Sequence, residues 1–358
     1  MASENINILN SLNLGIRRFP NDIVLKYYAP TKLVPTKLVM TLTKEAAGFS
    51  NPINMQDNRA CFEAWCLIIK AKASDSSLKI ELDVKDITEA DYDGNLPENG
   101  HLGRFLYRIL KFSEQYKDWF NLSEKLKNLK DKFETYLDSH TFVTSTPSDE
   151  ASDNLDDLKN NLESYIEYVF WDSYRAQRDI LKLDRGAIVG RQLPVSLFEG
   201  TKLTKNGVFT CGKSAIDFWA LDGDTINVYE LKINNPMVGI ITEIFFYSNY
   251  VHDVFISNSL DHGKGRVEIE DGTYRSYNKI AGKQVKGIML SNSNSNRKIK
   301  IKGWHASLDA LSRTKIKEIM NKNGMSEAIQ YEFLEYKLDK LKLKPNKLGI
   351  EVCYISKP

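Results

Sequence analysis

The sequence contains little cysteine: four residues out of 358, namely Cys61, Cys66, Cys211 and Cys353. They are scattered along the chain without a Cys-x-x-Cys pair, which excludes a disulfide-stapled scaffold and a zinc knuckle of that kind. A chain of this length can bury a sizeable hydrophobic core without covalent cross-links. We therefore expect the cysteines to be reduced and to pack as small apolar side chains.

Long apolar runs are also missing. No stretch approaches the ~20 apolar residues that a membrane-spanning helix needs, and the opening MASENINILN lacks the basic start and apolar segment of a secretory signal. These absences lead us to expect a cytoplasmic protein that has no membrane partner.

The chain carries little net charge, +2 overall, but the charge is unevenly distributed. From Val285 onward there are fifteen Lys and Arg against seven Asp and Glu. This carboxy-terminal excess of positive charge suits contact with a polyanion, although the whole chain has no basic field.

The amino-terminal part is rich in predicted strands and then changes to helical spacing. Apolar and β-branched runs separated by Pro, Asn, Ser and Asp predict strands at Ile23–Tyr28, Leu38–Leu42, Cys61–Ala71 and Leu78–Val84. Apolar stripes from Leu102 to Leu137 then predict helix. The polar segment TSTPSDEASDN has nothing to bury and marks a boundary. We expect an amino-terminal recognition or regulatory domain at 1–143, a linker at 144–154 and a second domain at 155–358.

The second domain shows a helix, three strands, a helix and a further strand, followed by a basic extension, so the predicted fold class is α+β. The expected helices are Leu155–Trp171, one beginning at Pro236, and a last one ending near Leu341; the expected strands are Ala187–Leu197, Val208–Leu221, Ile226–Ile233, Lys286–Leu290 and Ile350–Ile355.

Charged residues interrupt the two strands of a predicted hairpin. Asp222-Gly223 is a strong signal for a two-residue turn, which would place Asp217 opposite Val228 and Trp219 opposite Ile226. Strand alternation then brings three charged side chains to one face of the sheet, Asp217, Glu230 and Lys232. A three-residue loop without a bulge would instead send Asp217 to the other face.

Two carboxylates and an ammonium on a partly buried sheet face are unfavourable unless something holds them. Mg²⁺ or Mn²⁺ prefers carboxylate oxygens, so Asp217 and Glu230, with the carbonyl of Leu231, predict an open metal site. Lys232 could position or deprotonate a water, or stabilise charge on a phosphate. This combination suits hydrolysis of a phosphodiester.

These residues resemble the motif of the PD-(D/E)XK nuclease superfamily, which has a restriction-endonuclease-like fold. Asp217 and Glu230-Leu231-Lys232 match that motif, whereas Ile216 stands where the name places proline. The resemblance covers about Leu155 to Leu290. It implies that the two acids are metal ligands and that the lysine is catalytic.

The resemblance also implies roles for the neighbouring helices. The family often has a glutamate on its first core helix, where Glu163 is the best placed and Glu167 competes one turn later. Some members carry Gln-x-x-x-Tyr on the following helix, and Glu243 and Tyr247 have that spacing with Glu in place of Gln. We therefore take Glu163 as an assisting metal ligand, and Glu243 with Tyr247 as substrate contacts.

Further contacts to nucleic acid can be suggested outside the motif. Arg191 and Gln192 interrupt an apolar strand and could reach the scissile phosphate or a base, or simply face solvent. Four basic residues could grip the phosphate backbone or form a solvated edge: Arg297, Lys298, Lys300 and Lys302.

The sequence thus predicts a Mg²⁺- or Mn²⁺-dependent nuclease. We expect DNA rather than RNA as substrate and, by resemblance, an endonuclease in a restriction or antiviral defence role. A homodimer would suit cleavage of both strands of a duplex, and a partner defence protein is the other possible association. Two alternatives stay open: a nucleic-acid-binding or regulatory subunit that uses the fold without catalysis, and a surface hairpin with an ordinary Glu230–Lys232 salt bridge.

Overall fold

The structure is a computed structural model of the whole chain. It describes residues 2–31, 36–88, 91–92, 96, 100–144, 162–210, 214–234, 237–260, 282–293, 303–343 and 350–356. The predicted linker from residue 145, the first part of the helix expected from Leu155, and the basic residues Arg297, Lys298, Lys300 and Lys302 lie outside these ranges.

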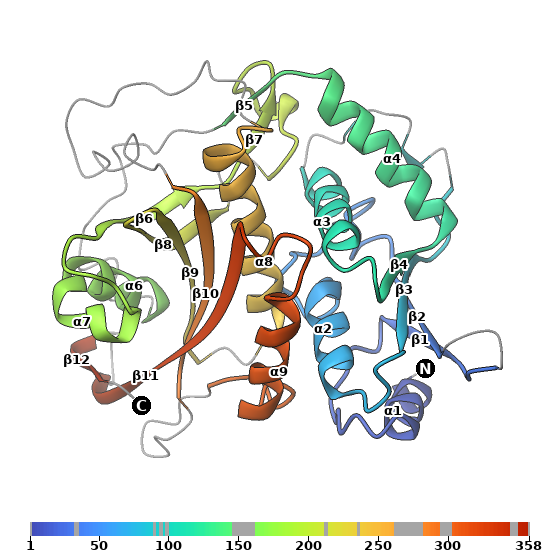
Figure 1. Ribbon diagram of the computed structural model, residues 1–358, viewed down its shortest axis with the longest axis horizontal. Coiled ribbons are helices and arrows are strands. Elements are labelled where there is room, and N and C mark those ends of the chain that lie inside the picture. Colours follow the sequence, from blue (N-terminus) through green and yellow to red (C-terminus); the bar gives the residue numbers. More distant parts are fainter. Residues whose placement is uncertain are drawn as a thin grey trace.

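The amino-terminal part is built around a four-stranded sheet, flanked by α1 (Ala2–Ser11) (Figure 1). The strand order is β1 (Val24–Tyr28), β2 (Lys37–Leu42), β3 (Lys79–Val84) and β4 (Phe120–Leu122). Strand β1 is antiparallel to β2, while β2, β3 and β4 are parallel. Parallel neighbours need crossover connections, which α2 (Phe62–Lys72) and α3 (His101–Gln115) provide.

The strand predicted at Cys61–Ala71 is therefore wrong, because these residues form α2. A continuous apolar run has no period that separates a buried helix from a buried strand, and nearly every residue of α2 is buried. The helical spacing predicted from Leu102 to Leu137 is found in α3 and α4 (Glu124–Ser139), but β4 interrupts it.

The carboxy-terminal part is built around a six-stranded sheet in the order β12-β11-β10-β9-β8-β6. Its strands are β6 (Ile188–Pro194), β8 (Ala215–Asp222), β9 (Thr225–Lys232), β10 (Gln284–Asn292), β11 (Ile329–Leu343) and β12 (Ile350–Ser356). Strand β8 is antiparallel to both β6 and β9, whereas β10 runs parallel to both β9 and β11. A small ladder joins β5 (Phe142–Thr144) to β7 (Leu197–Glu199). The predicted α+β class is confirmed.

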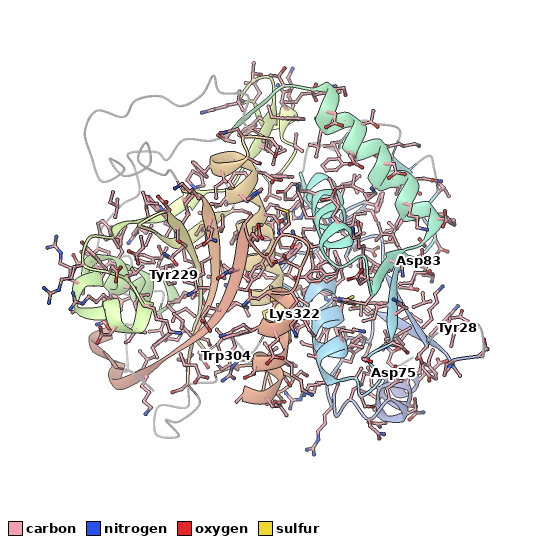
Figure 2. All side chains as sticks on the ribbon, viewed as in Figure 1. Tyr28, Asp75, Asp83, Tyr229, Trp304 and Lys322 are labelled. Atoms are coloured by element: carbon pink, nitrogen blue, oxygen red, sulfur yellow. The ribbon has the colours of Figure 1, made fainter. Side chains whose placement is uncertain are left out.

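Helices cover both faces of this sheet (Figure 1). One face packs on α6 (Leu162–Asp172) and α7 (Tyr174–Leu181), and Figure 2 places Tyr229 there, where its hydroxyl donates to the Leu181 carbonyl at 2.8 Å. The other face packs on α8 (Gly239–Val251), which continues into the π-helix η3 (His252–Ile256). The helix expected from Pro236 is thus seen from Gly239, and residues 235–236 are not described.

The last predicted helix is also wrong. Helix α9 (Ala310–Met320) ends well before Leu341, and β11 occupies the residues that follow it. Strand β11 buries Tyr331 against one cluster of apolar side chains and Leu334 against another. Burial on both faces removes the simple alternation of a half-buried strand, so the mixture of apolar and charged residues resembled a helix.

One large buried apolar cluster connects the two sheets. It includes β2, α2 and α3 from the amino-terminal part, and α8 and Val228 of β9 from the carboxy-terminal part. Residues on both sides of the expected boundary at 144–154 therefore share an interior. No helix within the described ranges is long and apolar enough to cross a membrane.

Candidate active site

The β8–β9 hairpin turns one residue later than predicted. Its two-residue loop is Gly223-Asp224, because Asp222 pairs with Thr225. Gly223 adopts φ 58°, a left-handed conformation that glycine reaches without a steric penalty. Trp219 consequently pairs with Val228, which corrects its predicted partner, Ile226.

The later turn leaves the face of each charged residue unchanged, because the shift adds one residue to β8 and removes one from β9. Asp217 is now level with Glu230 instead of Val228, just past the last pair of the ladder, Phe218 with Tyr229. The Asp217 carboxylate accepts a hydrogen bond of 2.9 Å from the backbone N–H of Leu231. The carboxylate therefore lies against the β9 backbone between Glu230 and Lys232.

The Lys232 ammonium lies among three carboxylates from three different elements. Its Nζ is 2.6 Å from Glu230 Oε1, 3.3 Å from Glu243 Oε2 and 3.4 Å from Glu163 Oε1. Glu230 and Glu243 are almost fully buried, whereas the Glu163 side chain is 33% exposed. Helices α6 and α8 thus close the site from two sides, and Glu163 together with half-buried Asp217 marks its solvent side.

A second group of side chains holds Glu167, the competitor of Glu163 on α6. The Gln192 amide donates to both Glu167 carboxylate oxygens at 2.9 Å, and the Arg191 Nε is 3.8 Å away. The Arg191 guanidinium also lies over the rings of Tyr168 and Trp171, at 5.6 and 5.7 Å. Arg191 and Gln192, predicted as contacts for nucleic acid, here contact an acid of the site.

Gln192 adopts φ 52° within β6, a conformation that a non-glycine residue rarely takes. Strained backbone of this kind persists where the surrounding structure enforces it, often at functional sites. From this backbone position Gln192 contacts Glu167, while Glu163, one turn earlier on α6, contacts Lys232. The structure brings the two together instead of selecting one of them.

Burial is the main cause of raised pKa values among the acids of the site. Burial, reinforced by Asp217, raises the pKa of Glu167 to about 8. Burial raises the pKa of Asp217 to about 7, even though the Lys232 ammonium and the Leu231 N–H work against the rise. Burial and the neighbouring Asp217 and Glu243 also raise the pKa of Glu230 well above its usual range.

The pKa of the Lys232 ammonium is also raised, but for a different reason. Burial alone would lower the pKa of Lys232, but the adjacent acids, Glu230 first, raise it well above its usual value. Tyr247, predicted beside Glu243, is buried on α8, and burial with the nearby Glu230 and Glu243 raises the pKa of its phenol. Five carboxylates therefore share this region with the cations of Lys232 and Arg191.

Sequence reasoning missed Arg104 of α3, which approaches the site from the amino-terminal part. Its guanidinium is buried and contacts neutral atoms: Thr210 Oγ1 at 3.1 Å, Ser214 Oγ at 3.2 Å and His101 Nδ1 at 3.2 Å. Burial lowers its pKa to about 10, although Tyr247 and Glu243 oppose that change. Nothing in the local sequence indicates this, because α3 is placed only by tertiary packing.

The oxygen atoms of these acids are the candidate ligands for a divalent cation. Among the described residues, no group of three or more His, Cys, Asp or Glu side chains is already arranged around one ion position. The Lys232 ammonium lies where acids from three elements meet, which explains that result. The buried Glu230 Oε2 has no hydrogen-bond partner in the described part of the chain. Carboxylates with raised pKa values and one uncommitted oxygen fit a hard cation.

Comparisons with known proteins add no identity to this geometry: the chain matches no protein-family model, no curated protein and no solved structure.

Proposed function

We propose that the protein is a metal-dependent nuclease that hydrolyses phosphodiester bonds of nucleic acid. One observation carries the proposal: a buried excess of carboxylates from β8, β9, α6 and α8 surrounds a single lysine ammonium. A fold gains nothing from burying so many like charges unless a cation or a reaction uses them.

The order of elements supports this proposal. Helix α6, strands β6, β8 and β9, helix α8 and strand β10 occur in the order of the restriction-endonuclease-like αβββαβ core, with α7 inserted before β6 and β7 inserted after it. Strand β10 returns parallel to β9 after the α8 crossover, and the acids lie on β8 and β9 as the PD-(D/E)XK motif requires. We propose that residues 162–292 form such a core.

Asp217 and Glu230 would hold Mg²⁺ or Mn²⁺, with Glu163 and the Leu231 carbonyl as further oxygen donors. When bound, the ion supplies Lewis-acid stabilisation of the phosphate oxygens. Lys232, whose pKa is raised, keeps its proton, which favours orienting the attacking water and stabilising negative charge over acting as a base. Glu167, held by Gln192 and Arg191, would be a further acid of the site beside Asp217.

We propose DNA as the substrate ahead of RNA, a cytoplasmic setting, and an endonuclease role in restriction or antiviral defence. The carboxy-terminal excess of Lys and Arg would grip the phosphate backbone. With one site per chain, cutting both strands of a duplex would use a homodimer or a partner defence protein.

A second function deserves a test because the lysine already neutralises part of the cluster. An ammonium within 3.4 Å of three carboxylates can act as a built-in counterion, and the fold would then bind nucleic acid without cutting it. This alternative predicts binding that is indifferent to divalent metal.

The deciding experiment incubates supercoiled plasmid, linear DNA and RNA with the full chain in Mg²⁺, Mn²⁺ or EDTA. We expect products only with metal, and a loss of about 10³-fold or more in rate for Asp217→Asn and for Lys232→Ala. Asp222→Asn, at the far end of the same strand, is the matched control and should cut normally. Unchanged cleavage by either site variant would remove the assignment, and mobility shifts without products would establish the binding alternative.

A further inference from the structure

A cavity of about 950 Å³ lies apart from the acid cluster, between the amino-terminal part and the segment that precedes α9. Four parts of the chain line it: residues 18–22, residues 57–59 with Trp65, Met237, and residues 303–306. Figure 2 shows Trp304 at this place, beside β11 and α9, where it packs on Phe333 at 5.5 Å. The volume of the cavity falls in the range typical of ligand sites.

One side of the cavity is a rigid aromatic wall. The Trp65 ring lies 4.8 Å from Phe19 and 5.9 Å from His305, measured between ring centroids. The Trp65 indole N–H donates to the Asn58 carbonyl at 2.7 Å, which fixes the orientation of the ring. Trp65 and His305 are almost fully buried, so the half-buried Phe19, which they support, presents the ring on which a nucleobase would stack.

The polar groups of the cavity are also held in place. His305 Nδ1 accepts from the Ser307 N–H at 3.1 Å, so Nε2 carries the proton of the neutral ring, and burial lowers its pKa. The Arg59 guanidinium is fixed by two hydrogen bonds to Asp57, of 2.9 and 2.8 Å. Arg18 is exposed and makes no hydrogen bond or ion pair with another described residue. One guanidinium therefore remains for an anion.

The cavity adjoins the connection that leaves the proposed catalytic strand. Met237 lines it five residues after Lys232, and the Val238 N–H donates to the Asn58 side chain at 3.1 Å. A second cavity of about 530 Å³ shares Trp304 and His305 with the first and reaches Ser293, just past the end of β10. Two adjoining cavities at the carboxyl ends of β9 and β10 suit a chain of nucleotides better than one small molecule.

We propose that this cavity binds a nucleotide unit of the nucleic-acid strand, with its base against the Phe19–Trp65–His305 wall and its phosphate on Arg18. The ligand chemistry, a planar base joined to a phosphate, is shared by free nucleotides, and the test separates the two sources. The reading as substrate recognition rests on the proposed function, whereas nucleotide binding itself does not.

The test measures fluorescence anisotropy of a labelled twelve-nucleotide single-stranded DNA with the full-length Asp217→Asn protein in EDTA, so that cleavage plays no part. Arg18→Ala should weaken binding about tenfold and lower the salt dependence by about one released counterion. Arg17→Ala removes a neighbouring exposed arginine that does not line the cavity, and should change affinity less than twofold. Phe19→Leu keeps apolar volume, removes the ring, and should weaken binding several-fold.

Equal effects of Arg18→Ala and Arg17→Ala, or no effect of Arg18→Ala and Phe19→Leu, would overturn the inference. Displacement of the strand by dAMP at a dAMP concentration near the strand's Kd would identify the free nucleotide as the ligand. The result is independent of the nuclease proposal. If Arg18→Ala and Phe19→Leu weaken binding but the protein shows no metal-dependent cleavage, the nucleotide site is supported and the nuclease proposal is wrong. If the protein cleaves but these variants bind normally, only the nuclease proposal is supported.

Discussion

Two buried clusters of charge in this molecule differ in balance. At the junction of α2, α3 and α8, Glu63 receives two hydrogen bonds from Arg108, of 2.6 and 2.5 Å, and a third of 3.0 Å from Thr242. Arg108 completes its bonding with the Ala60 carbonyl at 2.9 Å. In the acid cluster, by contrast, Glu230 Oε2 has no hydrogen-bond partner in the described part of the chain.

The difference separates two uses of buried charge. The Glu63–Arg108 pair is neutral, and both Glu63 oxygens are saturated by hydrogen bonds, so it requires no ion from solution and joins elements from both parts of the chain. The acid cluster places five carboxyl groups beside the cations of Lys232 and Arg191, and the pKa values of three of these carboxyls are raised. A site in that condition gains stability from an added cation, which a saturated pair does not.

The largest stability effect that tests this contrast is expected from Glu63→Gln. It leaves the Arg108 guanidinium buried without a countercharge and should lower the free energy of unfolding by about 3–5 kcal/mol. Glu230→Gln should change it by less than ~1 kcal/mol in EDTA, because Lys232 keeps Glu243 and Glu163 as partners while repulsion falls. Urea unfolding of both variants measures this, and equal losses would erase the distinction.

A divalent cation should have the next largest effect. Mg²⁺ or Mn²⁺ at 100 times its Kd should raise the free energy of unfolding of the wild-type protein by about 2.7 kcal/mol, since it binds only the folded state. Asp217→Asn should abolish most of the gain, while Glu124→Gln, which removes a carboxylate that is 83% exposed, should retain it. Thermal unfolding with and without EDTA gives the comparison. If the cation stabilises Asp217→Asn as much as wild type, the proposed metal site is wrong.

A third expected effect is a dependence of stability on pH. The folded pKa values of Asp217, about 7, and Glu167, about 8, lie above the ~3.9 and ~4.3 of unfolded chains. The folded state therefore binds more protons between these limits, and in EDTA its stability should fall as pH rises from about 4 to about 8. Asp217→Asn should flatten this slope relative to wild type, and saturating Mg²⁺ should do the same. Identical slopes for all three samples would contradict the raised pKa values.

The local geometry of the hairpin could be predicted from sequence, because a shift of one residue in a two-residue turn preserves which residues share a face. Asp217, Glu230 and Lys232 were brought together although the turn was placed one residue early. The spacing of Glu243 and Tyr247 likewise placed both on α8 near the site. Period-two and period-3.6 patterns carry this information directly.

The rest depended on tertiary packing. The α2 residues were expected as a strand and β11 as a helix, because both segments are covered on more than one side and lose the period that distinguishes them. Arg104 and the Gln192–Glu167 contact were not foreseen, since each joins residues at least 25 positions apart. Such contacts follow only once the layers are stacked.

The amino-terminal end of α8 packs so closely on residues 56–58 that the two parts of the chain cannot simply be separated. At Gly239 an added Cβ would lie 2.0 Å from the Gln56 carbonyl oxygen, and the Val238 N–H bonds to Asn58. The helix that carries Glu243 thus packs against a loop of the amino-terminal part. Expressing residues 155–358 alone would leave α8 without the loop on which it packs. We therefore expect the two parts of the chain to fold only when both are present.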